Sequence, residues 1–330
     1  MSKSKKILIV RFSSIGDIVL TTPTIRCVRE QTGAEVHFLT KKSFRGVLEG
    51  NPFLSKIYSV EKSYEEIIEQ LKDEGYDLIL DLQHNMHSWR LKRALKIRAY
   101  SFPKLNIEKW LLVNARINIM PERHIVDRYL STTLSLGVHN DGKGLDYFIP
   151  EQSEVKSEEY LPGRGSYVAF VIGAAHFTKR LPEEKIIAIC RKLNHPVVLL
   201  GGKEEAAIGA QIAQESGIHV YNACGKFNLH QSASWVQQSA IVISHDTGLM
   251  HIAAAFQKKI ISVWGNTMPV LGMYPYYAEG INHNISVEVN GLPCRPCSKI
   301  GYQKCPKGHF KCMQLIDVNL IAAKVNEVFS

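Results

Sequence analysis

The sequence predicts an α/β protein made of two doubly wound parallel sheets, and three observations lead to that class. Apolar runs of strand length alternate with amphipathic runs of helix length, as in consecutive β-α-β units. The alternation occurs twice, before and after a polar, acidic stretch at residues 151–165 that contains Pro and Gly. A chain of 330 residues also suits two domains of ordinary size.

The first half of the chain supplies the first sheet. Its short apolar runs, each ending at turn residues, predict strands at 5–12, 34–40, 55–60 and 76–83. Helical spacing of apolar residues predicts one helix from Asp17 to Glu30 and another over 63–75. We therefore expect a first domain at 1–160.

The second half repeats this rhythm. Strands are predicted at 166–173, 196–202, 218–225, 240–246 and 258–265. Helices are predicted at 181–193, 203–217, 230–239, 248–256 and 313–329. We expect a second domain at 161–312, followed at 313–330 by a terminal helix that is a candidate to pack back on the first domain.

The formal net charge of +9 is concentrated in two segments. Residues 82–128 contain ten Lys and Arg against three acids, and residues 290–312 contain five against none. Such segments favour nucleic acid, an anionic membrane surface or a polyanionic substrate as partner. We expect no nucleic-acid partner, because no nucleic-acid-binding motif is present and few aromatic residues are interleaved for base stacking. The apolar runs are much shorter than the roughly 20 residues of a membrane span. The N-terminal segment is also a poor match to a signal peptide, so we expect a cytoplasmic protein.

A first candidate site follows the first strand, where the sequence RFSSIGDIVLTTP occupies residues 11–23. Gly16 lets a ligand approach the backbone closely, and Asp17 stands at the entrance of the predicted helix. Two interpretations stay open for this carboxylate: a helix cap or a catalytic group.

A second candidate site, ISHDTGLMHIAAA, joins a buried strand to a helix rich in small residues. The N–H groups at the start of that helix, around Thr247 and Gly248, form an anion site suited to a pyrophosphate. His251 lies one turn further on, as either a ligand or a core histidine, and Asp246 either caps the helix or binds hydroxyl and N–H groups. Lys179 and Thr267 follow neighbouring strands, so both are expected at the same edge of the sheet.

These motifs, with DLQHNMHSWR, TKRLPEE and WGNTMP between and after them, occur in an order that resembles glycosyltransferase family nine, the ADP-heptose:lipopolysaccharide heptosyltransferases. The resemblance covers residues 6–312 and implies a GT-B fold of two facing Rossmann-like domains. It implies inverting transfer of a heptose from a nucleotide sugar, with ADP-heptose as the expected donor, onto lipopolysaccharide inner core. Asp17 would be the general base, and the donor would contact Lys179, Asp246, Thr247, Gly248, His251 and Thr267.

From the first basic segment we expect His87, Arg90 and Arg93 to bind the anionic acceptor. We also expect peripheral contact of the protein with the inner face of the cytoplasmic membrane. A solvated helix face is the alternative for these residues. No D-x-D triplet is present, which agrees with catalysis that requires no metal or other cofactor. Two other functions stay open: a sugar-nucleotide 2-epimerase of similar fold, and a non-enzymatic basic protein that binds nucleic acid or membrane.

The second basic segment holds four cysteines, Cys294, Cys297, Cys305 and Cys312. The C-x2-C pair followed by two more thiols resembles a small zinc knuckle, although the second half is C-x6-C. Three interpretations remain: a structural zinc site, reduced thiols without metal, or disulfides.

Overall fold

The computed structural model describes residues 4–161 and 165–330, which form two compact units. The first unit comprises Met1–Lys104 and Arg123–Phe148, and the second comprises Leu105–Glu122 and Ile149–Ser330. The chain therefore leaves the first unit after Lys104, contributes a helical segment to the second, and returns at Arg123.

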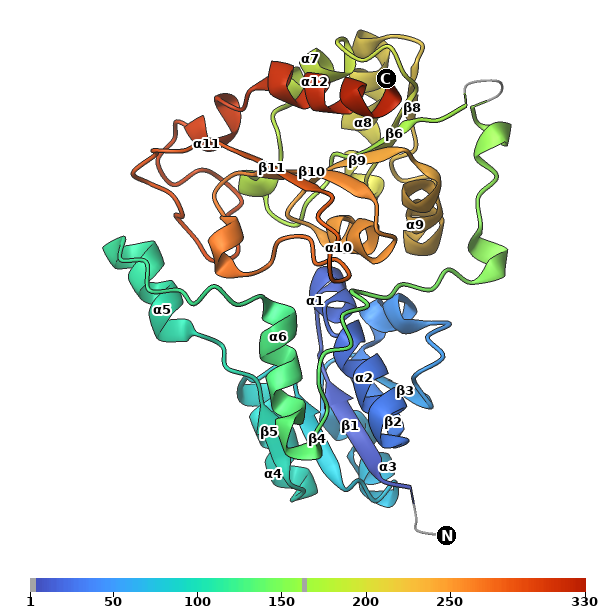
Figure 1. Cartoon of the computed structure of the whole chain (residues 1–330), viewed down its shortest axis with the longest axis vertical. Coiled ribbons are helices and arrows are strands. Elements are labelled where there is room, and N and C mark those ends of the chain that lie inside the picture. Colours follow the sequence, from blue (N-terminus) through green and yellow to red (C-terminus); the bar gives the residue numbers. More distant parts are fainter. Residues whose placement is uncertain (1–3, 162–164) are drawn as a thin grey trace. The chain divides into compact units, whose positions relative to one another are not determined.

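The first unit contains a five-stranded sheet in the order β3-β2-β1-β4-β5, with every neighbouring pair parallel (Figure 1). Its strands are β1 (Lys6–Val10), β2 (Glu35–Lys41), β3 (Lys56–Val60), β4 (Leu78–Asp81) and β5 (Ala99–Ser101). Its helices are α1 (Ile15–Val19), α2 (Thr22–Thr32), α3 (Ile68–Asp73), α4 (Met86–Leu95) and α6 (Ile125–Leu130), with 3-10 turns η1 (Lys42–Leu48), η2 (Tyr64–Ile67) and η4 (Ser131–Leu136). Strand order reverses between β1 and β4, so ligands are expected beyond the carboxyl ends of those two strands.

The four predicted strands of this unit are confirmed, but the single helix predicted from Asp17 to Glu30 is wrong. The chain forms α1 and α2 with a turn at Leu20 and Thr21 between them. Thr21 and Thr22 donate side-chain hydrogen bonds to the carbonyls of Ile18 and Val19, and such local bonds compete with a continuous helix. The helix predicted over 63–75 likewise begins as the 3-10 turn η2 and continues as α3.

The second unit contains a six-stranded parallel sheet in the order β11-β10-β9-β6-β7-β8. Its strands are β6 (Val168–Val171), β7 (Val197–Leu200), β8 (Val220–Asn222), β9 (Ile241–His245), β10 (Lys259–Trp264) and β11 (Asn284–Glu288). Its longer helices are α7 (Glu183–Cys190), α8 (Ala206–Ser216), α9 (Leu229–Gln238), α10 (Gly248–Ala255) and α12 (Val318–Phe329). The shorter helical elements are α5 (Asn106–Trp110), the π-helical η3 (Leu111–Ala115), η5 (Glu151–Ser153), η6 (Ser157–Glu159), η7 (Phe177–Lys179), η8 (Lys203–Glu205), η9 (Pro269–Leu271) and α11 (Lys311–Gln314). Strand order reverses between β6 and β9, and the predicted α/β class with two parallel sheets is confirmed.

The units divide the chain at other positions than residue 160. The polar stretch predicted as a linker packs against α9: Val155 N–H donates to Ser234 Oγ at 2.9 Å, and the Tyr160 ring lies 5.7 Å from the Trp235 ring. Its residues 162–164 lie outside the described part of the chain. Because these contacts anchor the stretch, the second unit already begins at Ile149.

The chain end belongs to the second unit. The helix predicted over 313–329 is divided into α11 and α12, because the Asp317 carboxylate caps α12 by accepting from the N–H groups of Asn319 and Leu320. α12 packs against α7, and Figure 1 shows the two side by side. Its residues Ile321 and Val325 are fully buried in the core of this unit.

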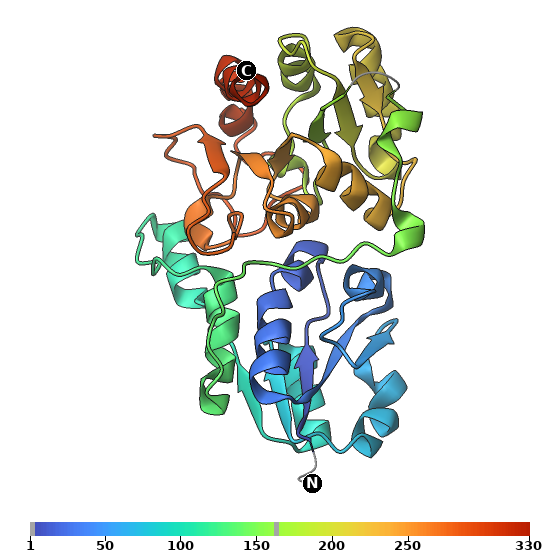
Figure 2. The ribbon, with the colours of Figure 1, turned by 45° about the vertical axis from the view of Figure 1, so that its right-hand side comes forward.

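The helical segment 105–122 also packs on the second unit. Leu112 and Met120 form a small apolar cluster with Leu271 of η9, and Figure 2 shows α5 beside that turn. No helix among the described residues is long and apolar enough to cross a membrane.

Candidate active site

Asp17 lies at the carboxyl end of β1, in the first turn of α1. One of its oxygens accepts two hydrogen bonds from Ser14, from the backbone N–H at 3.1 Å and from the hydroxyl at 2.8 Å. The other oxygen forms an ion pair with the Arg11 guanidinium at 2.7 Å. Arg11 is itself fixed by donating to the carbonyls of Ser13 and Leu82, each at 2.7 Å. The carboxylate is therefore held in one orientation, and its side chain remains 21% exposed.

This environment keeps Asp17 ionised. Burial opposes the charged form, but the Arg11 guanidinium and the hydrogen bonds from Ser14 outweigh it and hold the pKa of the carboxyl below its usual value. Arg11 was missed in the sequence, although it lies only six residues earlier in the same motif. A basic residue at a strand end, just before a turn and an acid, was the available signal.

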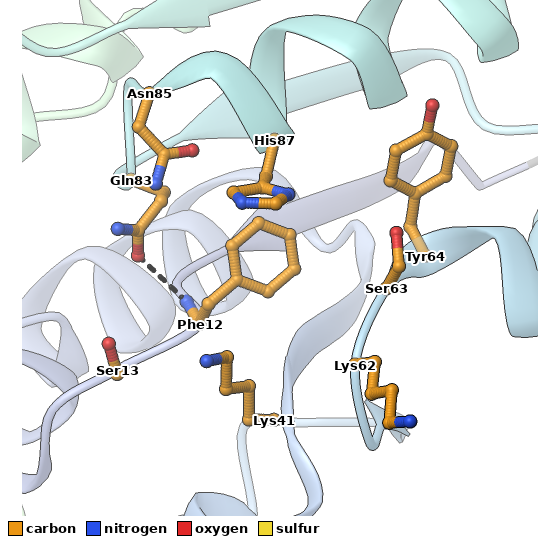
Figure 3. A pocket seen from close by; sticks show the side chains of 9 residues that line it. All are labelled: Phe12, Ser13, Lys41, Lys62, Ser63, Tyr64, Gln83, Asn85 and His87. Atoms are coloured by element: carbon orange, nitrogen blue, oxygen red, sulfur yellow. Dashed lines mark hydrogen bonds between the residues drawn. The ribbon is translucent and has the colours of Figure 1, made fainter.

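A polar pocket opens beside this turn within the first unit. It is lined by Phe12, Ser13, Lys41, Lys62, Ser63, Tyr64, Gln83, Asn85 and His87. These residues follow the carboxyl ends of β1, β2, β3 and β4, where an open parallel sheet binds ligands. Figure 3 shows His87 on one side of the Phe12 ring and the Lys41 ammonium group on the other, while Gln83 accepts the Phe12 N–H at 2.9 Å. Two lysines and a histidine at one rim make the pocket suitable for an anionic group.

Of the residues predicted for the acceptor, only His87 lines this pocket. Arg90 and Arg93 are exposed on α4, where the Arg93 guanidinium lies 4.8 Å from the centre of the Trp89 ring. Lys92 on the same helix has a structural role, because its ammonium group lies 2.7 Å from the fully buried Asp81 carboxylate. Lys41, Lys62 and Tyr64 were missed, since each follows a strand whose end looked unremarkable in isolation.

The second candidate site lies at the reversal point of the second sheet. β9 ends at His245, Thr247 is the N-cap of α10, and Gly248 is its first residue. Thr247 and Gly248 are half-buried, so the first turn of this eight-residue helix can be reached by a ligand. His251, one turn further on, is buried with 2% exposure. The N–H groups of such a first turn attract anions.

Three of the predicted side chains meet beside this helix start. The Lys179 ammonium group lies 2.6 Å from Asp246 Oδ2, and the Thr267 hydroxyl donates to the same oxygen at 3.0 Å. The Lys179 and Asp246 side chains are 14% and 11% exposed. Asp246 therefore fixes the positions of the Lys179 ammonium group and the Thr267 hydroxyl.

His245 is a further residue that sequence reasoning missed. Its ring is fully buried, and Nε2 accepts the Leu181 N–H at 2.9 Å, which fixes the turn after Lys179. Burial, with the nearby Arg180 charge, lowers the pKa of His245 to about 3, so the ring is neutral. A histidine as the last residue of a buried strand was the only signal.

The segment between β11 and α11 packs against this site. The Arg295 guanidinium, in a side chain 3% exposed, donates to the carbonyls of Gly265 and Thr267 at 2.6 and 3.2 Å and pairs with Glu288 at 2.8 Å. Tyr302 N–H donates to the Thr178 hydroxyl at 2.8 Å, and Tyr302 C=O accepts the Thr178 N–H at 3.1 Å. Both turns that supply Lys179 and Thr267 are thus held by one segment.

The four clustered cysteines belong to this segment and are not disulfide-bonded. Burial raises the pKa of Cys312 to about 11, and the nearby thiols of Cys297, Cys305 and Cys294 raise it further. All four thiols therefore lie in one neighbourhood. Cys294 Sγ is 3.9 Å from His309 Nε2.

Comparison with known proteins agrees with this architecture. Residues 65–305 match the sequence profile of glycosyltransferase family 9 (heptosyltransferase). A lipopolysaccharide heptosyltransferase 1 from Campylobacter coli is 23% identical over 307 residues, which cover 85% of this chain and 88% of that protein. A family 9 glycosyltransferase structure from Veillonella parvula superposes with a TM-score of 0.79 at 20% identity, covering 99% and 98% of the two chains. The structure of E. coli ADP-heptose lipopolysaccharide heptosyltransferase II gives a TM-score of 0.73 at 16% identity, covering 98% of each.

Two parallel-sheet α/β units are the architecture of the GT-B fold, which the heptosyltransferase structure compared above shares. The profile match extends over well more than half of the sequence, and the chain belongs to glycosyltransferase family 9, the heptosyltransferases. It is therefore a glycosyltransferase, and neither the epimerase nor the non-enzymatic alternative holds.

Proposed function

We propose that the enzyme transfers a heptose from ADP-heptose to an inner-core sugar of lipopolysaccharide, with inversion at the transferred carbon and without a catalytic metal ion. The observation that carries this proposal is the grouping of Lys179, Asp246 and Thr267 beside the first turn of α10. A fixed cation, a hydroxyl and free helix N–H groups suit a nucleoside diphosphate.

The donor is assigned to the second unit. Its pyrophosphate would accept hydrogen bonds from the N–H groups at Thr247 and Gly248 and the charge of Lys179, while Asp246 keeps Lys179 and Thr267 in place. The E. coli enzyme compared above is an ADP-heptose transferase, which supports an adenine nucleotide as the donor here.

Asp17 is assigned as the general base. The acceptor hydroxyl oxygen attacks the anomeric carbon from the face opposite the diphosphate, the bond from that carbon to the phosphate oxygen breaks, and the hydroxyl proton passes to Asp17. The low pKa of Asp17 makes it a weak base, but a hydroxyl becomes strongly acidic once its oxygen bonds to an electron-poor carbon. Proton transfer late in the reaction therefore needs only an ionised, oriented carboxylate.

Lys179, the N–H groups of the first α10 turn and His251 would stabilise the charge that grows on the departing diphosphate. These groups would take the place of a bound cation, so we expect sugar transfer to need no added divalent metal ion.

The acceptor is assigned to the pocket of the first unit. Lys41, Lys62 and His87 offer positive or hydrogen-bonding groups to a carboxylate or phosphate of the inner core. Arg90 and Arg93 are exposed nearby on α4 for further anionic groups.

Contact with an anionic membrane surface is assigned to the helical segment 105–119. Four large apolar side chains there are exposed by 52–74%: Ile107, Trp110, Ile117 and Ile119. Lys109 and Arg116 lie among them. Apolar side chains mixed with basic ones favour insertion at the interface of an anionic leaflet, as peripheral attachment of a lipopolysaccharide enzyme at the inner face of the cytoplasmic membrane requires.

Calorimetric titration with ADP and UDP tests the donor assignment, with Thr247→Trp as the variant whose indole blocks the helix start. We expect ADP to bind the unaltered enzyme and not the variant. The enzyme should then transfer heptose from ADP-heptose to truncated lipopolysaccharide, and NMR of the product should show an inverted anomeric configuration. Binding of UDP in place of ADP would overturn the heptose donor, and binding of neither nucleotide would overturn the site.

A further inference from the structure

Among the described residues of the second unit, the longest stretch without helix or strand carries three thiols, and a fourth follows in α11. No helix or strand lies between the end of β11 at Glu288 and the start of α11 at Lys311. Irregular segments of this length are uncommon within a compact domain unless something holds them. This one is nonetheless packed inward, because Arg295, Ser298 and Phe310 are each less than 10% exposed.

The thiols are distributed along the whole segment, and three of them are only half-buried. Cys294 and Cys297 lie at its beginning, Cys305 near its middle and Cys312 just past its end. Cys312 is anchored in the core with 4% exposure, whereas the other three are half-buried on irregular backbone. A zinc ion would need only the three half-buried thiols to approach the buried Cys312.

The charge of the segment also suits a metal thiolate cluster. Four thiolates around Zn²⁺ carry a net charge of about −2. Residues 290–312 contain five Lys and Arg and no acid. Arg295 is paired with Glu288, which leaves four lysines in the segment to compensate a buried anionic cluster.

We propose that Cys294, Cys297, Cys305 and Cys312 bind one zinc ion, which holds the segment 289–312 against the turns that supply Lys179 and Thr267. Tetrahedral Zn–S bonds of about 2.3 Å bring sulfur atoms to about 3.8 Å from one another. No three of these sulfur atoms lie within 4.8 Å of one another in the structure, so zinc binding draws Cys294, Cys297 and Cys305 inward. The ion is structural, because four thiolates leave no open coordination position for chemistry.

Among the residues that the structure describes, the group that brings three candidate ligand atoms within 4.8 Å of one another is Glu35, His37 and Glu74. Glu74 already pairs with the ammonium groups of Lys6 and Lys56, at 2.5 and 2.8 Å. Two neighbouring cations make that group an ion-pair network rather than a metal site.

Elemental analysis of the full chain tests the proposal, after purification under reducing conditions from cells grown with added zinc. We expect about one zinc ion per chain, and less than about a fifth of that in Cys294→Ser and Cys305→Ser, whose half-buried positions limit the cost to folding. Cys27→Ala is the matched control: this thiol is fully buried in α2 of the first unit, and its loss should leave the zinc content unchanged.

A second measurement does not depend on the variants. Titration of the unaltered protein with a mercurial, with a zinc dye present, should release the ion as four thiols react. Removal of zinc by a chelator should lower the melting temperature by roughly 5 °C or more and weaken ADP binding several-fold. Zinc content is measured independently of sugar transfer, so failure of the donor assignment leaves this test intact.

Metal below about a tenth of an ion per chain after incubation with zinc would overturn the proposal. A disulfide between any two of the four cysteines in the reduced preparation would also overturn it. Iron bound in place of zinc, and lost in the same variants, would support the four ligands and overturn zinc as the ion.

Discussion

The substitution Asp17→Asn separates the proposed chemistry from donor binding. The amide has the same size as the carboxylate and can still accept from Ser14, but it cannot take a proton. General bases contribute about 10²–10⁴ in rate, so kcat/KM should fall by that factor, which corresponds to about 3–5 kcal/mol in the transition state. The affinity for ADP should stay unchanged, because every residue assigned to the donor belongs to the second unit.

Replacing Arg11 by Met tests how the base is held. The ion pair joins side chains that are only 11% and 21% exposed, and loss of one partner from a buried pair costs about 3–5 kcal/mol. We expect the lower end of that range, since Asp17 keeps some contact with water and both hydrogen bonds from Ser14. Without the guanidinium, burial dominates and the pKa of Asp17 rises. The acid limb of the pH–rate profile should therefore move to higher pH in Arg11→Met.

The assay is release of ADP from ADP-heptose in the presence of truncated lipopolysaccharide, with calorimetry of ADP binding on the same preparations. Asp73→Asn, which removes an exposed carboxylate at the end of α3, is the control and should behave as the unaltered enzyme. If Asp17→Asn keeps kcat/KM within about threefold, a rate change too small for loss of a general base, then Asp17 is not the base. If it loses ADP binding as well, the loss of activity says nothing about proton transfer.

Three further predictions concern other parts of the chain. Lys179→Met should weaken ADP binding by roughly 10–100-fold in calorimetry, because it removes a charged partner of the diphosphate. His245 has a folded pKa of about 3 against 6.5 unfolded, so the unfolded chain binds the extra proton and stability falls as pH decreases between those values. The loss is about 2 kcal/mol from pH 6.5 to pH 5, and His245→Gln should remove it in urea titrations at pH 7 and pH 5; an equal loss in the variant would contradict the assignment. Trp110→Glu should reduce sedimentation of the protein with anionic vesicles and leave the rate of sugar transfer to truncated, delipidated acceptor unchanged. Undiminished sedimentation would show that the segment 105–119 is not the membrane-contacting surface.

The strands were predictable because most are buried apolar runs that end at turns, a signal contained in a few consecutive residues. β11 and β5 were missed for the opposite reason: β11 has exposed positions at Ile285 and Ser286, and β5 has only three half-buried residues. The division into units was not predictable in detail. The segment 105–122 belongs to the second unit because of tertiary contacts of Leu112 and Met120. No local sequence pattern indicates these contacts.

The candidate sites show the same limit. Asp17, Lys179, Asp246 and Thr267 were identified because each follows a strand in a recognisable motif. Arg11, which orients Asp17, is fixed by the Leu82 carbonyl that follows a neighbouring strand, and His245 and Lys41 likewise act through contacts between elements. Such contacts depend on the order of the strands in the sheet. The alternation of strands and helices along the sequence does not determine that order.

Asp246 bears on how the enzyme would release its product. A diphosphate joined to a sugar carries one negative charge fewer than the free nucleoside diphosphate that remains after transfer. A bare Lys179 beside the α10 N-terminus would therefore hold the product more tightly than the donor, and release would limit turnover. The Asp246 carboxylate, 2.6 Å from that ammonium group, offsets its charge while fixing its position. Under the proposed function, Asp246 keeps Lys179 oriented toward the diphosphate. It also weakens the attraction between Lys179 and the leaving diphosphate, which favours departure of ADP.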